Sequence, residues 1–244
     1  MSKKKKRILL MSDDLRIHSG IATQTKEFVM GTLNHYEWVQ IGGAVKHPEE
    51  GKIIDMNESA RKETGVKDAY LKIYPTSGYG NPDMLRQIIS IEKPDAILHF
   101  TDPRFWVWFY NMEHEIRQNI PIMYYNIWDD LPDPLYNRDF YRSSDLLMAI
   151  SKQTYGINKR VLKDYNYEDW QITYVPHGIN SKKFFHIDEN DTNLNKFKND
   201  FNLNKYKFKL LYLNRNIRRK QMGDVVMAYK HQPNYKGNSF LHHS

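Results

Sequence analysis

The chain has 244 residues and no cysteine, which excludes disulfide bonds and thiol chemistry and predicts a cytoplasmic location. Its composition, 40% hydrophobic and 27% charged, is typical of a soluble globular protein, and no apolar run approaches the roughly 18 residues of a transmembrane segment. The net charge of +7 is concentrated in two basic segments, residues 3–7 and 205–220, and the remainder is acidic. A specific nucleic-acid binder carries a continuous basic face, so this distribution disfavours that class and suits a phosphate site in the second segment.

The amino-terminal part begins with the pattern of a Rossmann-like unit. The apolar run Ile8–Met11 predicts a buried strand, and the spacing of apolar residues over 21–29 predicts an amphipathic helix. Ser19 and Gly20 form a small-residue pair in the loop between them. The dinucleotide spacing GxGxxG is absent, which disfavours a nicotinamide cofactor. The pair is therefore either part of a ligand-binding loop or a plain turn.

Further apolar runs predict more strands of the same sheet. They cover residues 38–43, 71–74, 94–100, 120–127, 145–152 and 170–175, and several are separated by helical patterns. We therefore expect an α/β fold with a doubly wound, mostly parallel sheet over residues 1–185. The polar segment 48–65 is expected to be irregular.

Polar side chains follow two of the predicted strands. His99 and Asp102 lie at the end of one, and Asp129 and Asp130 follow the next. Open α/β sheets bind ligands at the carboxyl ends of their strands. Asp129 or Asp130 is predicted to bind or deprotonate a hydroxyl group, with helix capping and loop hydrogen bonding as the alternative. No spacing of acidic and histidine residues predicts a metal site.

An aromatic run over residues 105–110 follows the strand that ends near His99. It has two interpretations, a platform on which a sugar ring stacks or the apolar beginning of a core helix. We favour the core helix.

The carboxyl-terminal part predicts the beginning of a second domain. Residues 186–207 have the composition of a linker with a short surface helix, and residues 208–213 predict a strand that leads towards a helix near residues 225–229. Arg215 and Lys220 lie in the basic turn between them. Such a turn suits phosphate oxygens at a helix N-terminus, although it also fits a solvated basic turn. Residues 231–244 show no period and are expected to be irregular.

Several of these motifs together resemble the retaining GT-B glycosyltransferases of family four. One is Arg215 with Lys220 after the strand, and another is the Ser-Asp pair 144–145 followed by a strand that ends in Ser151. The third is Pro-His-Gly-Ile-Asn at residues 176–180, with a phenylalanine soon after. Ser19 and Gly20 match the loop that faces the interdomain cleft in this family. Two positions depart from the family pattern, because Gln221 replaces a glycine and Trp128 replaces a histidine.

The resemblance implies two Rossmann-like domains, with the acceptor at the first and the nucleotide sugar mostly at the second. The reaction would transfer a sugar to a glycan or another hydroxyl acceptor with retention, as in hexosyltransferases, with no cofactor and no metal. Arg215 and Lys220 would bind the donor diphosphate. His99, Asp102, His177 and Gly178 would be candidates for acceptor or sugar contacts, although His177 and Gly178 equally fit a structural role.

The family's downstream pair of glutamates has no counterpart, so the chain resembles a fragment that is inactive alone. The predicted organisation is a first domain over 1–185, a linker over 186–207, an incomplete second domain over 208–230 and a tail over 231–244. The remaining partner would be a separately encoded carboxyl-terminal half or a second copy of the chain. Two alternatives stay open: a non-catalytic sugar- or anion-binding domain, and another Rossmann-fold enzyme of phosphorylated sugars, such as an epimerase.

Overall fold

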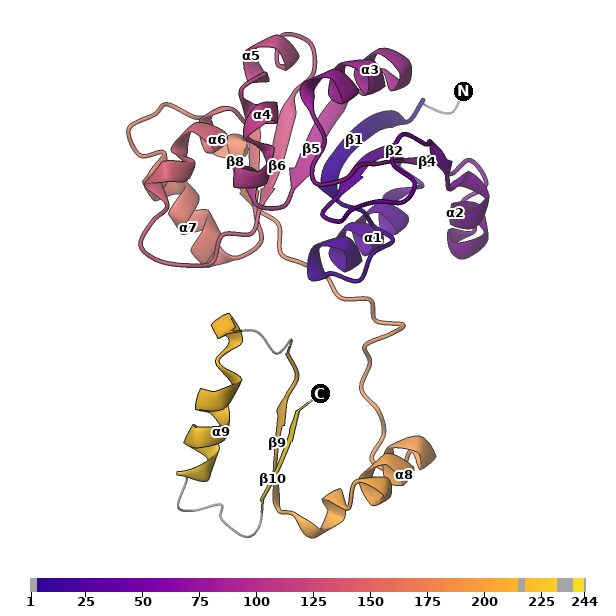
Figure 1. Ribbon diagram of the computed structural model, residues 1–244, viewed down its shortest axis with the longest axis vertical. Coiled ribbons are helices and arrows are strands. Elements are labelled where there is room, and N and C mark those ends of the chain that lie inside the picture. Colours follow the sequence, from indigo (N-terminus) through magenta and orange to yellow (C-terminus); the bar gives the residue numbers. More distant parts are fainter. Residues whose placement is uncertain (1–3, 215–217, 232–238, 244) are drawn as a thin grey trace. The chain divides into compact units, whose positions relative to one another are not determined.

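The protein is described from a computed structural model that covers residues 4–214, 218–231 and 239–243. The chain divides into two compact units, Met1–Ile179 and Asn180–Ser244 (Figure 1). The first unit thus ends slightly before residue 185, where the sequence places the end of the first domain. Each unit is considered by itself below.

The first unit is built on an eight-stranded sheet with the order β3-β4-β2-β1-β5-β6-β7-β8. The strands are β1 (Lys6–Asp13), β2 (Tyr36–Gly43), β3 (Ile54–Asp55), β4 (Leu71–Pro75), β5 (Ala96–Phe100), β6 (Ile122–Asn126), β7 (Leu146–Ala149) and β8 (Ile172–Tyr174). All neighbouring pairs are parallel except β3 with β4. The predicted α/β fold with a mostly parallel sheet is confirmed, and within the described part of this sheet the only strand that the sequence did not predict is the two-residue β3.

Helices lie on both faces of this sheet (Figure 1). The α-helices are α1 (Gly20–Thr32), α2 (Asn57–Thr64), α3 (Pro82–Glu92), α4 (Val107–Tyr110), α5 (Glu113–Ile116), α6 (Arg138–Arg142) and α7 (Lys152–Val161). Short 3-10 turns are η1 (Pro103–Trp106), η2 (Leu135–Asn137) and η3 (Asp169–Gln171). The expectation of an irregular segment over 48–65 was wrong where α2 forms. The sequence of α2 is mostly polar because it buries only Ala60 against the sheet.

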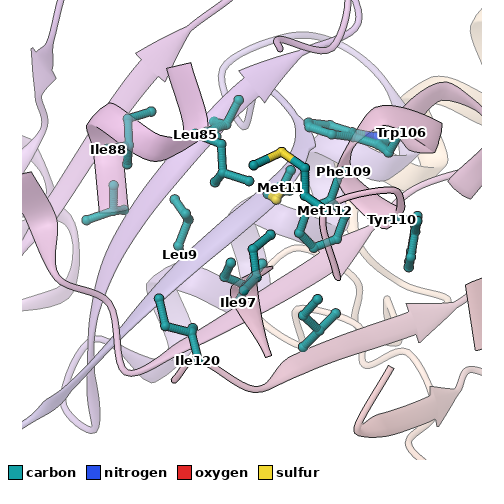
Figure 2. Packing of buried hydrophobic residues seen from close by; sticks show 14 of the residues in the cluster. Leu9, Met11, Leu85, Ile88, Ile97, Trp106, Phe109, Tyr110, Met112 and Ile120 are labelled. Carbon is teal, nitrogen blue, oxygen red and sulfur yellow. The ribbon is translucent and has the colours of Figure 1, made fainter. Parts of the chain in front are cut away.

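The alternation of side chains along the strands creates a core on each face of the sheet. In β1, Leu9 and Met11 face the cluster under α3 and α4, whereas Ile8 and Leu10 face the cluster under α1. Figure 2 shows the first cluster, in which Trp106 and Phe109 close over the sheet. The aromatic run is therefore mostly core, as the sequence favoured.

The strand register determines which loops meet at the carboxyl edge of the sheet. Asp13, at the end of β1, pairs with Gly43 of β2, and Ser12 pairs with Phe100 of β5. The segments that follow β1, β2 and β5 therefore begin side by side. This edge is where the predicted ligand residues of the first unit are placed.

The second unit has one strand–helix–strand unit after a short helix. Its elements are α8 (Thr192–Asp200), η4 (Leu203–Lys205), β9 (Phe208–Tyr212), η5 (Arg218–Lys220), α9 (Met222–Lys230) and β10 (Ser239–His243). β10 pairs in parallel with β9, so residues 239–243 differ from the irregular tail expected there. The strand that returns after α9 forms hydrogen bonds with the backbone N–H and C=O groups of β9. This backbone pairing does not require a periodic pattern of apolar residues in the sequence.

Candidate functional site

The residue at the centre of the carboxyl edge is Asp13, the last residue of β1. Ser19 Oγ donates a hydrogen bond to Asp13 Oδ2 across 2.8 Å, and the Tyr79 hydroxyl lies near enough to the same carboxyl group to lower its pKa. Burial raises the pKa of Asp13, and the Ser19 and Tyr79 hydroxyls oppose this rise only in part. Asp13 is therefore a carboxyl group that takes up a proton more readily than an ordinary aspartate.

The loop after β1 is fixed by the cap of α1. Ser19 Oγ accepts a hydrogen bond from the backbone N–H of Ala22, which makes Ser19 the N-cap of the helix. Gly20 is the first residue of α1, it is exposed, and a Cβ atom there would contact nothing within 4 Å. The fold therefore does not require a glycine at this position.

Asp14, the neighbour of Asp13, has a different environment. It is fully buried, and its Oδ2 atom lies 2.8 Å from Arg16 Nη2 and 3.2 Å from His47 Nε2. Arg16 also forms an ion pair with Glu49 across 2.8 Å. The charge of Asp14 is thus used within the fold, and only Asp13 of the two faces the loops at the edge.

Tyr79 lies in the loop between β4 and α3, against the side of Asp13. Its ring stacks on Phe105 with a centroid distance of 4.9 Å and meets Trp106 edge-on at 5.3 Å. Burial, together with the nearby carboxylates Asp13 and Asp102, raises the pKa of Tyr79 to about 12. The hydroxyl therefore stays protonated at neutral pH and can act as a hydrogen-bond donor. One side of the site is thereby an aromatic surface, because Phe105 is 54% exposed.

Asp102 follows β5 and lies near enough to Tyr79 for its charge to raise the pKa of that hydroxyl. It caps η1 by accepting from the backbone N–H of Arg104 across 3.0 Å, and it forms an ion pair with the Arg104 guanidinium. Desolvation would raise the pKa of Asp102, but the hydrogen bonds and charge of Arg104 outweigh it and lower that pKa. Asp13 and Asp102 are thus two carboxyl groups near one tyrosine whose pKa values are shifted in opposite directions, an arrangement suited to acid–base work.

His99 lies on β5, beneath this edge. The side chain is fully buried, its Nδ1 atom lies 2.7 Å from the Tyr110 hydroxyl, and its ring stacks on Tyr124 at 5.0 Å. Burial lowers the pKa of His99 to about 3, so the imidazole is neutral at physiological pH. This placement leaves His99 no surface with which to contact an acceptor.

Asp129 and Asp130 lie in the exposed loop after β6. Asp130 Oδ1 accepts from the backbone N–H of Leu131 across 2.8 Å, and the Asp130 carbonyl accepts from Trp128 Nε1 across 2.9 Å. Gln153 Nε2 donates to the Asp129 carbonyl across 3.0 Å. Within the described part of the chain, no hydrogen bond or ion pair engages the Asp129 carboxylate. Asp129 therefore has both carboxylate oxygens available to a hydroxyl group, whereas one oxygen of Asp130 is occupied by the Leu131 N–H.

His177 and Gly178 follow β8 and are exposed. The His177 ring meets Tyr125 edge-on at 5.3 Å and Phe100 at 5.8 Å, so it packs beside the ends of β5 and β6. A Cβ atom on Gly178 would contact nothing within 4 Å. His177 thus lies close to the carboxyl edge, whereas Gly178 has no packing requirement for a glycine.

The predicted diphosphate residues belong to the second unit. Lys220 ends η5 and is half-buried, and its carbonyl accepts a short hydrogen bond from the Tyr212 hydroxyl. Arg215 lies outside the described residues. Gln221, the N-cap of α9, has a φ of 48° and a ψ of 44°. This is the left-handed region that favours glycine, which agrees with the glycine of the family pattern at that position.

Two residues of the site escaped the sequence analysis. Asp13 comes two residues after the predicted strand Ile8–Met11, and this position is the signal that could have identified it. Tyr79 could not have been assigned to the site from sequence, because only the fold brings its loop to β1 and β5. No group of three or more His, Asp or Glu side chains able to hold a metal ion occurs among residues 4–214, 218–231 and 239–243. The same residues contain no helix that is long and apolar enough to cross a membrane.

Comparison with known proteins provides fold neighbours only. No protein-family model and no curated protein sequence matches the chain. Among solved structures, Anabaena HepE in complex with UDP and glucose aligns over 98% of this chain with a TM-score of 0.61 and 9% identity. Trehalose 6-phosphate synthase from Burkholderia multivorans aligns over 99% with a TM-score of 0.61 and 11% identity. A putative UDP-N-acetylglucosamine 2-epimerase from Listeria monocytogenes aligns over 99% with a TM-score of 0.50 and 11% identity.

The chain spans 60%, 63% and 62% of the lengths of these three solved structures, respectively. At these identities the similarity establishes a shared fold. That fold is GT-B, in agreement with the resemblance read from the sequence.

Proposed function

We propose that this chain, which has the GT-B fold, carries the acceptor side of a glycosyltransferase that moves a sugar from a nucleotide sugar to an acceptor hydroxyl. The observation that carries the proposal is the grouping of Asp13, Tyr79 and Asp102 at the carboxyl edge of the sheet, where open α/β folds bind their ligands. The fold neighbours bound to UDP or named for sugar chemistry support the same class of substrate.

The acceptor would lie between the carboxylates and the aromatic surface. Carboxylate oxygens accept hydrogen bonds from sugar hydroxyls, and the exposed ring of Phe105 presents an apolar face to a sugar. Asp129, whose carboxylate is exposed, is our candidate for the group that binds or deprotonates the attacking hydroxyl. Lys220 and Arg215 would neutralise the charge that develops on the leaving diphosphate.

Acceptor binding is testable on the first unit by NMR titration with glucose, mannose and N-acetylglucosamine. We expect shifts at the amides of residues 13–20, 79 and 101–105, with a marked loss of affinity in Asp102→Asn. Asp139→Asn is the matched control, because the Asp139 carboxylate is 89% exposed on α6 and lies outside the proposed site. Equal affinity in the wild type and Asp102→Asn, or equal loss in both variants, would contradict the acceptor site.

The donor side is tested by calorimetry with uridine and guanosine sugar diphosphates. We expect the chain alone to bind them weakly and to show negligible transfer, because base and ribose contacts belong to the part of the GT-B fold that it does not span. Micromolar binding that survives both Arg215→Ala and Lys220→Ala would refute the diphosphate assignment.

A partner would complete the donor site. Leu211, Leu213 and Met227 of the second unit are 69%, 70% and 51% exposed, and covering such side chains stabilises by roughly 1.5–3 kcal/mol each. We propose a separately encoded carboxyl-terminal half, or self-association, as the source of that cover. Mixing the chain with a supplied GT-B carboxyl-terminal domain should produce transfer, and NMR of the product anomer would test retention.

A second candidate is a nucleotide-sugar epimerase, which the fold similarity to the Listeria protein favours. The two reactions differ in their need for an acceptor. Incubation of the completed protein with a nucleotide sugar alone should leave the donor sugar unchanged if it is a transferase. Inversion at C2 without any acceptor would instead establish the epimerase, and saturable sugar binding without either reaction would indicate a binding domain.

A further inference from the structure

We propose that Asn126, Asn137, Tyr141 and Asn158 enclose a site for internal water that positions the loop carrying Asp129. These four side chains, called the asparagine chamber below, come from β6, η2, α6 and α7. The water site stands on the geometry alone, whereas the role of the loop in sugar transfer rests on the proposed function.

The chamber is closed to solvent. Asn126 and Asn158 have no exposed surface, and Asn137 and Tyr141 are each 1% exposed. Polar groups buried to this degree almost always have hydrogen-bond partners, either protein or ordered water. Any group in the chamber that lacks a protein partner therefore needs another molecule.

The hydrogen-bonding groups of the chamber are only partly used. Asn126 Nδ2 donates to Asn158 Oδ1 across 2.7 Å, which leaves Asn158 Nδ2 without a partner. Neither amide atom of Asn137 has one. The Tyr141 hydroxyl lies next to the amides of Asn126 and Asn137 but forms no well-shaped hydrogen bond with either. Four polar atoms of the chamber are thus buried and unpaired.

The chemistry of these atoms identifies the ligand class. Asn158 Nδ2 and Asn137 Nδ2 are donors, Asn137 Oδ1 is an acceptor, and the Tyr141 hydroxyl serves as either. The set is neutral and mixes donors with acceptors, which disfavours a cation or an anion. A water molecule donates twice and accepts twice, and buried waters typically make about three hydrogen bonds to such groups.

The chamber is linked to the proposed acceptor loop through Trp128. Asn126 Oδ1 accepts from the backbone N–H of Trp128 across 3.0 Å, and Thr154 Oγ1 donates to the Trp128 carbonyl across 2.7 Å. Both backbone polar groups of Trp128 are therefore held by buried side chains, immediately before Asp129. Water held by Asn158 supports Asn126 through the hydrogen bond between the two amides, and Asn126 in turn holds the start of the Asp129 loop. Asn126 is therefore a positioning residue.

The water itself is tested in the full chain by crystallography at high resolution and by magnetic relaxation dispersion, which counts long-lived internal waters. We expect density within hydrogen-bonding distance of Asn137 and Asn158. The variant Asn137→Leu should lose at least one long-lived water and stay folded, because no protein hydrogen bond of the Asn137 side chain is broken. Asn119→Leu, at an exposed position, is the control and should lose none. A dry chamber in the wild type, with its amides paired directly to each other, would overturn the site.

Hydrogen exchange at the Trp128 amide tests the positioning role. We expect Asn137→Leu to accelerate this exchange by about tenfold relative to Asn119→Leu, because the support of Asn126 is loosened. Unchanged exchange at Trp128 would overturn the positioning role. None of these measurements uses a sugar, so failed transfer leaves the water site standing, and a dry chamber leaves the proposed transfer standing.

Discussion

Ser19 and Asp13 are joined by a hydrogen bond of 2.8 Å from the Ser19 hydroxyl to the carboxylate, and the same hydroxyl caps α1. One side chain therefore connects the end of β1, the start of α1 and the carboxyl group with the raised pKa. The loop of Ser19 and Gly20, which the sequence predicted, is thus bonded directly to Asp13, which the sequence did not identify. A matched pair of variants distinguishes the helix-capping role of the Ser19 hydroxyl from its effect on the pKa of Asp13.

We expect Ser19→Ala to lower stability by about 1 kcal/mol, the usual effect of removing an N-cap, and to raise the pKa of Asp13 further. Ser151→Ala is the control, because Ser151 Oγ caps α7 with the same 3.0 Å bond from a backbone N–H. Chemical denaturation should give similar losses for both variants. The pKa of Asp13, measured by NMR titration, should change only in Ser19→Ala. An equal change in Ser151→Ala would show that the loss of the Ser19 hydrogen bond is not the cause.

Gly43 and Gly20 provide a second test at the same edge. A Cβ atom on Gly43 would lie 2.3 Å from the carbonyl oxygen of Gly78, whereas one on Gly20 would meet nothing. We expect Gly43→Ala to lower stability by about 2 kcal/mol, because the Tyr79 loop must shift. Gly20→Ala should be neutral or stabilising by roughly 0.5–1 kcal/mol. If the Gly20 backbone approaches a ligand, Gly20→Ala will weaken sugar binding in spite of full stability.

The sequence predicted the sheet well because strands buried on both faces are continuous apolar runs, such as Ile8–Met11. It could not predict the inward direction of His99, since a side chain at a strand end faces either core according to its register. It also could not bring Tyr79 to Asp13, because the order of the strands decides which loops meet. The assignment of Asp129 and Lys220 to a reaction stays a prediction.

Gln221 offers a test of the turn in the second unit. Its left-handed backbone costs a residue with a side chain roughly 1–2 kcal/mol relative to glycine, and the greater freedom of glycine in the unfolded chain offsets part of that difference. We therefore expect Gln221→Gly to stabilise this unit by about 0.5–1 kcal/mol, measured by denaturation. Asn202→Gly is the control. Asn202 also has a positive φ, 52°, but asparagine tolerates this region, so little gain is expected. Destabilisation by Gln221→Gly would contradict the turn geometry.

Glu92 is a buried carboxylate of the first unit that accepts hydrogen bonds from four side chains. The carboxylate is 1% exposed and accepts from Tyr74 across 2.6 Å, from Tyr70 across 2.7 Å, from Arg7 across 3.2 Å and from Lys72 across 3.3 Å. All four partners are donors, which suits a group that only accepts. Desolvation would raise the pKa of Glu92, but the hydrogen bonds of Tyr74 and Tyr70 and the charge of Lys72 outweigh it and hold the pKa below its ordinary value.

We expect Glu92→Gln to lower stability at pH 7 by about 3 kcal/mol. The new amide N–H₂ would face other donors, and the partly buried cations Arg7 and Lys72 would lose the charge of their partner. The pH dependence follows from the lowered pKa. As pH falls, the unfolded chain takes up the Glu92 proton first, so the stabilisation is complete above the ordinary glutamate pKa and is lost as pH falls through the folded value. The difference between wild type and Glu92→Gln should therefore shrink between pH 7 and pH 3. Glu115→Gln is the control. The Glu115 side chain is 47% exposed and pairs with Arg86, so this variant should change stability little. A constant difference across this pH range would show that the Glu92 charge does not stabilise the fold.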